Sequence, residues 1–288
     1  MSEMRVITLV DNMCGTPYVQ SRLVKRLDSP TKHFMAEQGF SVMVETDNGL
    51  KVLFDAGASQ EALLNNLKVV GVEPKEFSAV FVSHGHYDHV GGLLPFIDAG
   101  VPIHTHPKTF VGKRFSTGGE SKVDISPSAQ VTAALAKAKM SFNSAPIEIV
   151  PGVRTSGEVP RVTDFEPTLN FLREEEGRML EDTVIDEQAM YLVQKRGIIV
   201  ITGCSHPGIV NIVTQAKKAT GSKVLMLIGG FHLGGGSQDR IRKTMDHLKN
   251  LGVDRIAPLH CTGFEAMKNI SDRFVGFELM PAGSEIEL

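Results

Sequence analysis

The segment VSHGHYDHVGGL places four potential metal ligands, His84, His86, Asp88 and His89, within six consecutive positions. His84 and His86 are two residues apart, so they can point at one ion if the backbone between them is extended. Gly85 relieves the steric limits on a tight turn at that point. Asp88 and His89 leave the same loop in another direction, so the two pairs suit two neighbouring metal ions better than one. Imidazole with carboxylate favours zinc, iron or manganese, whereas a lone histidine would more simply be a capping or hydrogen-bonding residue.

Other potential ligands or acid–base groups follow apolar runs elsewhere in the chain. The carboxyl ends of the strands in an α/β sheet lie along one rim, and sites form there. We therefore expect the side chains that follow these runs to meet. They are Asp55, His84, Cys204 with His206, His232 and His260.

The composition is that of a soluble globular protein with a substantial core. Of 288 residues, 42% are hydrophobic and 22% are charged, and the net charge is −3. This mild acidity, the absence of Trp and an aromatic content of 6% argue against a nucleic-acid partner. No run approaches ~18 apolar residues, so neither a membrane span nor a membrane partner is expected.

The cysteines Cys14, Cys204 and Cys261 form an odd set, so no disulfide framework is predicted and a reducing cytoplasm fits best. The first residues, MSEMRVITLVDNM, have no long apolar core after a basic stretch, which predicts no signal peptide. The sequence leaves the oligomeric state open, including a homo-oligomer.

Apolar strands that alternate with helices predict an α/β fold with a mixed sheet or two sheets. Residues 41–57 form a predicted hairpin around the turn DNG. Residues 59–71 form a predicted helix that Ser59 caps and Gly71 stops. The other predicted strands are 5–11, 77–83, 197–203, 223–230 and 255–260. The other predicted helices are 88–100, 208–219, 237–250 and 263–271. Asp88 is the predicted cap of the first of these helices.

Residues 112–190 follow a less regular pattern, apart from a helix predicted within 126–142. We interpret this region as a loop or hairpin insertion over the site, with a solvated surface excursion as the alternative. No tandem repeat, low-complexity tract or linker divides the chain, so residues 1–288 are predicted to form one domain.

The motif HGHYDHVGG matches the HxHxDH signature of the metallo-β-lactamase superfamily, and the preceding LFDAG matches the usual Asp-containing strand of that family. The resemblance extends over nearly the whole chain, to PLHCTG. It implies a four-layer αβ/βα sandwich with two mixed β-sheets and a dinuclear metal site at one edge between the sheets. Two divalent metal ions are therefore the expected cofactors, with zinc favoured over iron, manganese or magnesium.

The resemblance also implies which residues hold each ion. Asp55 would orient the ligands through hydrogen bonds, a common role for a carboxylate beside a metal-bound histidine. The implied ligands are His84 and His86 for the first ion, and Asp88, His89 and His260 for the second.

Two positions depart from the family pattern. Where most members have a histidine before the later strands, this chain has TSGEVPR, which offers Glu158 as a ligand or base. Where most have a bridging Asp, it has TGCSH, which offers Cys204 or His206. We favour His206 as the ligand, and Cys204 as a small buried residue beside the ligands.

Further roles follow for an enzyme of this family, those of the metals, Asp88 and His232 in a hydrolytic reaction and that of Lys113 and Arg114 in a synthase. The metals would lower the pKa of a bound water and polarise the scissile group, while Asp88 relays a proton. His232, among the glycines of GGFHLGG, could stabilise developing negative charge or act as a general acid. Lys113 and Arg114 could bind a phosphate group, and a solvated basic loop is the simpler alternative.

The segments AEQGFSVMVET, DEQAMYLVQKRGIIVITGCSHPGIVNIV, IGGFHL and LHCTG resemble one branch of the superfamily. That branch includes archaeal 7,8-dihydropterin-6-methyl-4-(β-D-ribofuranosyl)aminobenzene-5′-phosphate synthases of methanopterin biosynthesis. In such a synthase the metals would hold a pyrophosphate leaving group on the pterin, and an aromatic carbon of the second substrate would displace it. The expected partner is a small phosphorylated molecule.

Three alternatives stay open at the level of sequence. A metal-dependent phosphodiesterase or phosphohydrolase would use the same ligands. A nuclease is disfavoured by the charge balance and by the lack of an inserted second domain. A non-catalytic metal-binding sensor or ligand-binding relative would explain the departures at TSGE and GCSH.

Overall fold

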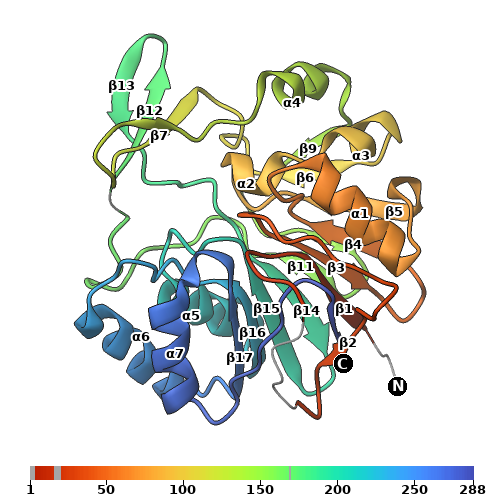
Figure 1. Ribbon diagram of the computed structural model, residues 1–288. Coiled ribbons are helices and arrows are strands. Elements are labelled where there is room, and N and C mark those ends of the chain that lie inside the picture. The colour runs from red at the N-terminus through yellow and green to blue at the C-terminus, as the bar shows by residue number, and fades with distance from the viewer. Residues whose placement is uncertain (1–3, 16–20, 169) are drawn as a thin grey trace.

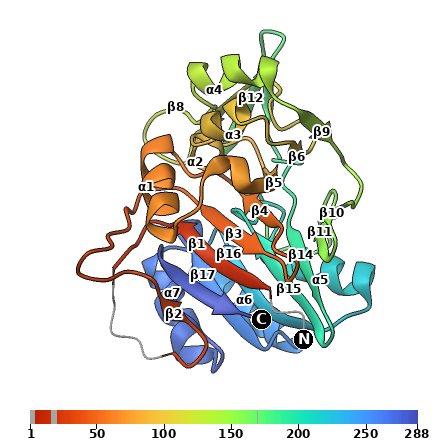
Figure 2. The same cartoon turned by 90° about the vertical axis from the view of Figure 1, so that its right-hand side faces the viewer.

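Two β-sheets pack face to face, and helices cover the outer face of each (Figures 1 and 2). The computed structural model describes residues 4–15, 21–168 and 170–288. This arrangement confirms the predicted four-layer αβ/βα sandwich. Among the described residues, no helix has the length and apolar character needed to cross a bilayer.

The first sheet has eight strands, in the order β2 (Lys25–Arg26), β18 (Ser284–Glu287), β1 (Arg5–Val10), β3 (Ser41–Glu45), β4 (Lys51–Phe54), β5 (Phe77–Phe81), β6 (Ile103–Thr105) and β9 (Met140–Phe142). The second has six, in the order β10 (Glu148–Val150), β11 (Val153–Thr155), β14 (Met190–Gln194), β15 (Gly197–Thr202), β16 (Val224–Gly230) and β17 (Arg255–Leu259). Both sheets mix parallel and antiparallel neighbours: β4 pairs with β5 in parallel and with β3 in antiparallel.

The helices form the two outer layers. The helices α1 (Gln60–Val70), α2 (Tyr87–Val90), α3 (Leu94–Asp98) and α4 (Ala129–Ala134) pack against the eight-stranded sheet. The helices α5 (Ile209–Thr220), α6 (Gln238–Asn250) and α7 (Phe264–Arg273) pack against the six-stranded sheet. Short 3-10 turns occur at Pro74–Glu76, Leu135–Lys137 and His260–Thr262.

The central strands are apolar on both faces because each lies between a helix layer and the other sheet. In β3, Val42 and Val44 pack between the sheets while Met43 faces the helices. In β15, Ile199 and Ile201 pack between the sheets, and the alternate residues face α5 to α7. This double burial explains the continuous apolar runs that mark these strands in the sequence.

The predicted hairpin and first helix are confirmed. The strands β3 and β4 pair across the DNG turn. The hydroxyl of Ser59 accepts a hydrogen bond from the backbone N–H of Ala62, and Gly71 ends α1 in the left-handed conformation with φ of 85°. The later predicted strands and helices are also present, within one or two residues of the predicted bounds.

The single helix predicted for 88–100 is wrong, because the chain forms two short helices, α2 and α3, separated at Gly91 and Gly92. A Cβ at Gly91 would lie 1.9 Å from the carbonyl oxygen of Ala58, and one at Gly92 would lie 2.3 Å from that of Ala56. The two glycines let the segment lie directly against the backbone after β4. Asp88 does not cap the helix but lies in its first turn.

The substitution Gly91→Ala should lower the free energy of unfolding by about 3 kcal/mol, because the added methyl group overlaps a backbone oxygen that cannot rotate away. Gly119→Ala is the matched control, since nothing lies within 4 Å of a Cβ at that position. Urea unfolding of both variants measures the difference. Equal midpoints for the two would contradict the packing described here.

The irregular region 112–190 contains more of the core than predicted, since β9, β10 and β11 join the two main sheets and β14 begins at its last residue. The helix predicted within 126–142 is present as α4, but it ends at Ala134, and the last three residues of the predicted segment form β9. The remaining part forms a small antiparallel sheet, in the order β13 (Arg178–Glu181), β12 (Phe171–Glu175), β7 (Lys113–Ser116) and β8 (Val123–Asp124). This small sheet stands apart from the sandwich in Figure 1, and β18 was not predicted at all.

Candidate metal centre

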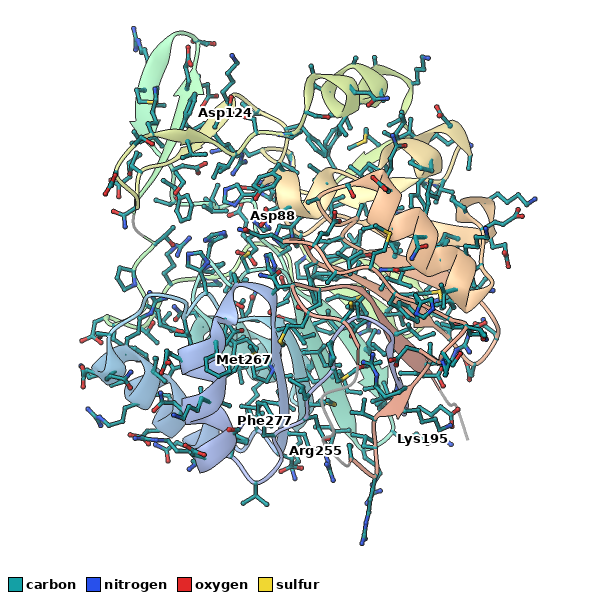
Figure 3. The ribbon with its side chains drawn as sticks, in the orientation of Figure 1. Asp88, Asp124, Lys195, Arg255, Met267 and Phe277 are labelled. Carbon is teal, nitrogen blue, oxygen red and sulfur yellow. The ribbon has the colours of Figure 1, made fainter. Side chains whose placement is uncertain are left out.

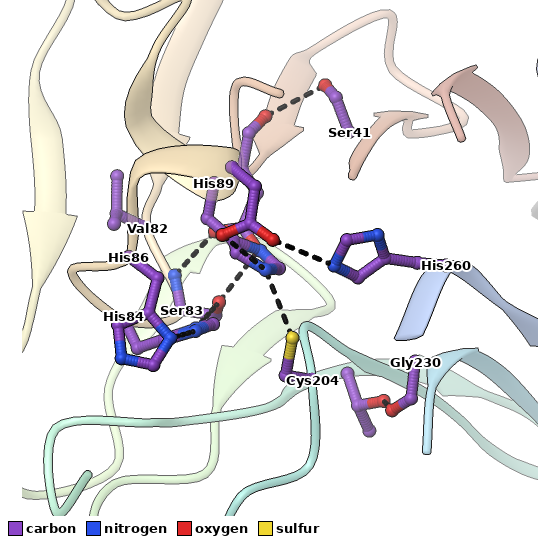
Figure 4. A network of polar contacts seen from close by, with 12 residues as sticks. Ser41, Val82, Ser83, His84, His86, His89, Cys204, Gly230 and His260 are labelled. Carbon is purple, nitrogen blue, oxygen red and sulfur yellow. Dashed lines mark hydrogen bonds and ion pairs between the residues drawn. The ribbon is translucent and has the colours of Figure 1, made fainter. Parts of the chain in front are cut away.

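The potential ligands predicted from the sequence gather at one rim of the sandwich, where parallel strands of both sheets end (Figures 3 and 4). The segments after β4 and β5 approach from the eight-stranded sheet. Those after β15, β16 and β17 approach from the six-stranded sheet. The residues brought together are His84, His86, Asp88, His89, Cys204, His206, His232, His260 and Cys261, the last of which the sequence reasoning did not propose as a site residue.

A first ligand group consists of His84, His86 and His206, whose ligand atoms all lie within 4.8 Å of one another. His84 Nε2 lies 3.0 Å from His86 Nδ1. Both ring nitrogens of His206 and Nε2 of His86 are buried without a hydrogen-bond partner in the described part of the chain. Burial lowers the pKa of each ring well below its usual range, and the neutral ring is the form that binds a metal ion.

A second ligand group consists of Asp88, His89 and His260, also within 4.8 Å of one another. His260 Nε2 lies 3.4 Å from Asp88 Oδ2, and His89 Nε2 lies 3.8 Å from Asp88 Oδ1. Burial opposes a charged ring at His89, but the carboxylates of Asp88 and Asp55 raise its pKa to about 9. Three ligands of mixed nitrogen and oxygen type with this spacing fit a divalent transition metal.

Asp55 orients two of the histidines through its buried carboxylate. Its Oδ2 lies 2.7 Å from His89 Nδ1, so the other ring nitrogen of His89 faces the ligand groups. The same carboxylate accepts hydrogen bonds from the N–H and the hydroxyl of Ser83, both at 2.7 Å. The Ser83 hydroxyl in turn lies 2.9 Å from His84 Nδ1, which fixes that ring as well. This is the role that the resemblance implied for Asp55.

Glu187 is a supporting residue that the sequence reasoning missed. Its buried carboxylate accepts hydrogen bonds from the backbone N–H groups of Cys204, Ser205 and His206, at 2.7, 2.5 and 2.5 Å. Burial raises its pKa to about 7, although these hydrogen bonds act in the opposite direction. The acid in DEQAM was visible in the sequence, but nothing local linked it to a turn formed by residues 204–206.

His260 is held in a similar way from the end of β1. Asp11 accepts a hydrogen bond from the His260 N–H at 2.8 Å, and Asn12 Oδ1 lies 2.9 Å from His260 Nδ1. The only signal in the sequence was a pair of polar residues directly after the first strand.

The backbone is strained at several of these positions. Asp55, Ser205, His232 and His260 have φ values of 54°, 64°, 46° and 49°, in the left-handed region that non-glycine residues seldom adopt. Such conformations cost on the order of 1 kcal/mol or more each and cluster at functional sites. Their coincidence with the strand ends indicates that the rim is shaped for function.

The structure does not bring Glu158 to the ligand groups. Glu158 Oε1 instead lies 2.9 Å from His106 Nε2, and its side chain is about half exposed. Of the residues that the sequence offered at the two departing positions, Glu158 thus lies outside the ligand groups, whereas Cys204 and His206 lie among the potential ligands.

Lys113 and Arg114 do not form a joint phosphate cradle. Arg114 is 1% exposed, and its guanidinium pairs with Asp182 at 3.1 Å and Asp186 at 3.0 Å, whereas Lys113 is exposed. Asp186 also accepts a hydrogen bond from the N–H of Gly85 at 3.0 Å. The buried arginine therefore supports the turn of the HGH motif.

A pocket of about 450 Å³ opens over both ligand groups. Phe171, from β12 of the small sheet, lines it, with ring centroids 4.9 Å from His206 and 5.3 Å from His86. His232 lines the same pocket, 4.4 Å from His206 between ring centroids, and its Nδ1 is buried without a hydrogen-bond partner in the described residues. A volume of this size suits a small molecule.

Comparisons with known proteins agree with this geometry. The family model described as the metallo-beta-lactamase superfamily matches residues 35–260. The chain is 35% identical over 268 residues to the 7,8-dihydropterin-6-methyl-4-(beta-D-ribofuranosyl)-aminobenzene-5′-phosphate synthase of Methanocaldococcus jannaschii, covering 88% of this chain and 91% of that protein. It is also 35% identical over 243 residues to an uncharacterised protein of the same organism, covering 83% of this chain and 90% of that protein.

Solved structures show the same fold. The crystal structure of Tm1679, described as a metal-dependent hydrolase of the beta-lactamase superfamily, has a TM-score of 0.81 and 31% identity and covers 99% of both chains. Zn²⁺-bound PqqB from Methylobacterium extorquens has a TM-score of 0.56 and 14% identity, covering 99% of this chain and 100% of that chain. At this level of identity the similarity concerns the fold only.

Proposed function

Because the chain belongs to the metallo-beta-lactamase superfamily, we propose that it is a metal-dependent enzyme whose two ligand groups each hold one divalent cation. The observation that carries this proposal is that both groups border a single pocket, to which His86 and His206 contribute from one group and Asp88 and His260 from the other. The buried ring nitrogens of His86, His206 and His260 that lack hydrogen-bond partners among the described residues would be satisfied by the cations.

We further propose that the substrate is a small phosphorylated molecule and that the reaction is of the pterin-linked synthase type. The identity of 35% over 88% of the chain to a synthase supports this choice. The pocket is also suited to a flat ring, because Phe171 offers an aromatic surface directly beside the ligand groups. The pocket volume of about 450 Å³ also suits a substrate of this size.

The chemistry divides between the cations and the chain. Bound divalent cations neutralise charge on phosphoryl oxygens and so favour departure of a pyrophosphate group. In the synthase reaction a C–O bond to the pyrophosphate would break, a bond to the amine nitrogen of the second substrate would form, and that nitrogen would lose a proton, because an arylamine nitrogen is a better nucleophile than a ring carbon. His232, with a ring nitrogen free of hydrogen bonds to the described residues, borders the pocket where it can hold a proton or bind an anionic oxygen.

The experiment that tests the proposal supplies the metal-loaded protein with two compounds, separately and together. One is a dihydropterin whose 6-methyl group carries pyrophosphate, and the other is 4-(β-D-ribofuranosyl)aminobenzene 5′-phosphate. Pyrophosphate release that requires both compounds is the expected result. Release from one compound alone would favour the phosphohydrolase alternative, and no turnover by fully metal-loaded protein would favour a non-catalytic binding protein.

The substitution Phe171→Ala should raise KM for the ring-containing substrate about 10-fold, because stacking on an aromatic side chain contributes ~1–3 kcal/mol. The effect on kcat should be smaller, since Phe171 belongs to neither ligand group. Phe142→Ala is a suitable control, because that ring is 51% exposed on β9 and does not line the pocket. Steady-state kinetics of both variants measure the difference, and an unchanged KM for Phe171→Ala would exclude stacking.

A further inference from the structure

We propose that the thiolate of Cys204 is a shared ligand that bridges the two cations, and that the centre therefore selects thiophilic metals. This inference rests on the proposed function, because it concerns the ligands of the same metal centre. Among the described residues, five sets of three side chains have ligand atoms within 4.8 Å of one another, and three of these sets contain Cys204. It is joined by His84 and His89 in one set, by His206 and His232 in another, and by His260 and Cys261 in the third. These sets place its sulfur within 4.8 Å of ligand atoms of His84 and His206 on one side, and of His89 and His260 on the other.

The position of the sulfur suits coordination. Cys204 Sγ lies 3.2 Å from His89 Nε2 and points toward the centre of the cluster (Figure 4). Two ligands on one tetrahedral ion lie about 3.5 Å apart when the metal–sulfur distance is ~2.3 Å and the metal–nitrogen distance is ~2.0 Å. The other potential ligands have similar spacing: His84 Nε2 lies 3.0 Å from His86 Nδ1, and His260 Nε2 lies 3.4 Å from Asp88 Oδ2. Little rearrangement is needed for both groups to share one sulfur.

A purely structural thiol explains less of the geometry. A hydrogen bond between Cys204 and His89 would account for that single contact. It would leave the ring nitrogens of His206 and Nε2 of His260 buried without hydrogen-bond partners in the described part of the chain. A pair of cations joined through the sulfur satisfies all of these atoms together.

The backbone around Cys204 is also held in place. Glu187 binds the N–H groups of Cys204 and His206, and Ser205 between them has a strained φ of 64°. One turn thus directs Cys204 toward both groups and His206 toward the first. A buried thiol that only filled space would not require a carboxylate to fix its backbone.

A thiolate ligand changes which metals the site prefers. Sulfur is a soft ligand that favours zinc, cobalt and ferrous iron over magnesium, calcium and manganese, which prefer oxygen ligands. The centre should therefore bind zinc or cobalt in the presence of a large excess of magnesium.

Cobalt titration of the metal-free protein tests this inference without any assay of activity. We expect a near-ultraviolet thiolate-to-cobalt charge-transfer band in the wild-type protein, and two equivalents of bound cobalt. Cys204→Ser should lose the band and bind both ions at least about 10-fold more weakly, because each loses a ligand; weakening of one ion alone would show a terminal ligand and overturn the bridge. Cys204→Asp should also lose the band but retain both ions, because a carboxylate can bridge them; it keeps the test valid if Cys204→Ser folds poorly.

The other two cysteines serve as controls. Cys14→Ser should retain the band, because Cys14 lies in none of the sets of potential ligands. Cys261→Ser should also retain it, and loss of the band in Cys261→Ser with retention in Cys204→Ser would assign the thiolate to Cys261 and overturn the inference. The inference is overturned if the band persists in Cys204→Ser, or if wild type binds two cobalt ions without showing a band. Failure of the folded wild-type protein to bind cobalt at all would overturn the proposed metal centre as well, so the two failures can be told apart.

Discussion

Replacing His206 with alanine should remove one of the two bound metal ions and lower kcat/KM by about 10³-fold, equivalent to ~4 kcal/mol of transition-state stabilisation. The reason is that His206 supplies one of the three ligands of the first group, and the loss of this ligand weakens the binding of that ion. Metal analysis after gel filtration measures the stoichiometry. The substrate assay proposed above measures the rate.

Glu158→Ala provides the matched comparison for this prediction, because Glu158 was the candidate ligand at the other position where the sequence departs from the family pattern. Its side chain pairs with His106 and lies outside the ligand groups. We expect it to keep both metal ions and to change kcat/KM by less than about 3-fold, within ~0.7 kcal/mol. Loss of a metal ion in Glu158→Ala with retention in His206→Ala would reverse the assignment made here.

Replacing Glu187 with alanine should destabilise the protein by roughly 3 kcal/mol or more and weaken metal binding at the same time. Three backbone N–H groups, at residues 204–206, would lose their acceptor, and each unsatisfied buried group costs ~1–3 kcal/mol. Water entering the space would satisfy some of them, so the full sum is not expected. Urea unfolding of the metal-free protein measures the stability, and cobalt titration measures the affinity.

Glu187→Gln separates the shape of this side chain from its hydrogen-bond acceptors. The amide keeps the volume and one acceptor oxygen but turns its NH₂ group toward a backbone N–H. We expect a loss of stability between those of the wild type and Glu187→Ala. If both variants unfold at the wild-type urea concentration, then Glu187 does not hold the turn that carries Cys204 and His206.

Local patterns predicted the parts of the site that are close together in the sequence. The HGHYDH motif follows β5 and opens α2 as expected, and its ligands lie within six residues, so backbone geometry alone confines where they point. The alternation of strands and helices predicted the layered fold because the strands bury both faces. Directly after this motif, the break between α2 and α3 was not predicted, because it depends on contact between Gly91 and Ala58, which is distant in the sequence.

Tertiary structure decided which distant residues complete the centre. His206, Cys204 and His260 come from strand ends of one sheet and meet the motif of the other only after the two sheets pack face to face. Glu187 likewise acts through contacts with residues 17 to 19 positions away. Short-range periodicity and spacing were enough to predict the fold class and the local ligand motif. The position of His206 and Cys204 among the potential ligands, and that of Glu158 outside them, depend on packing between sheets that no spacing along the chain specifies.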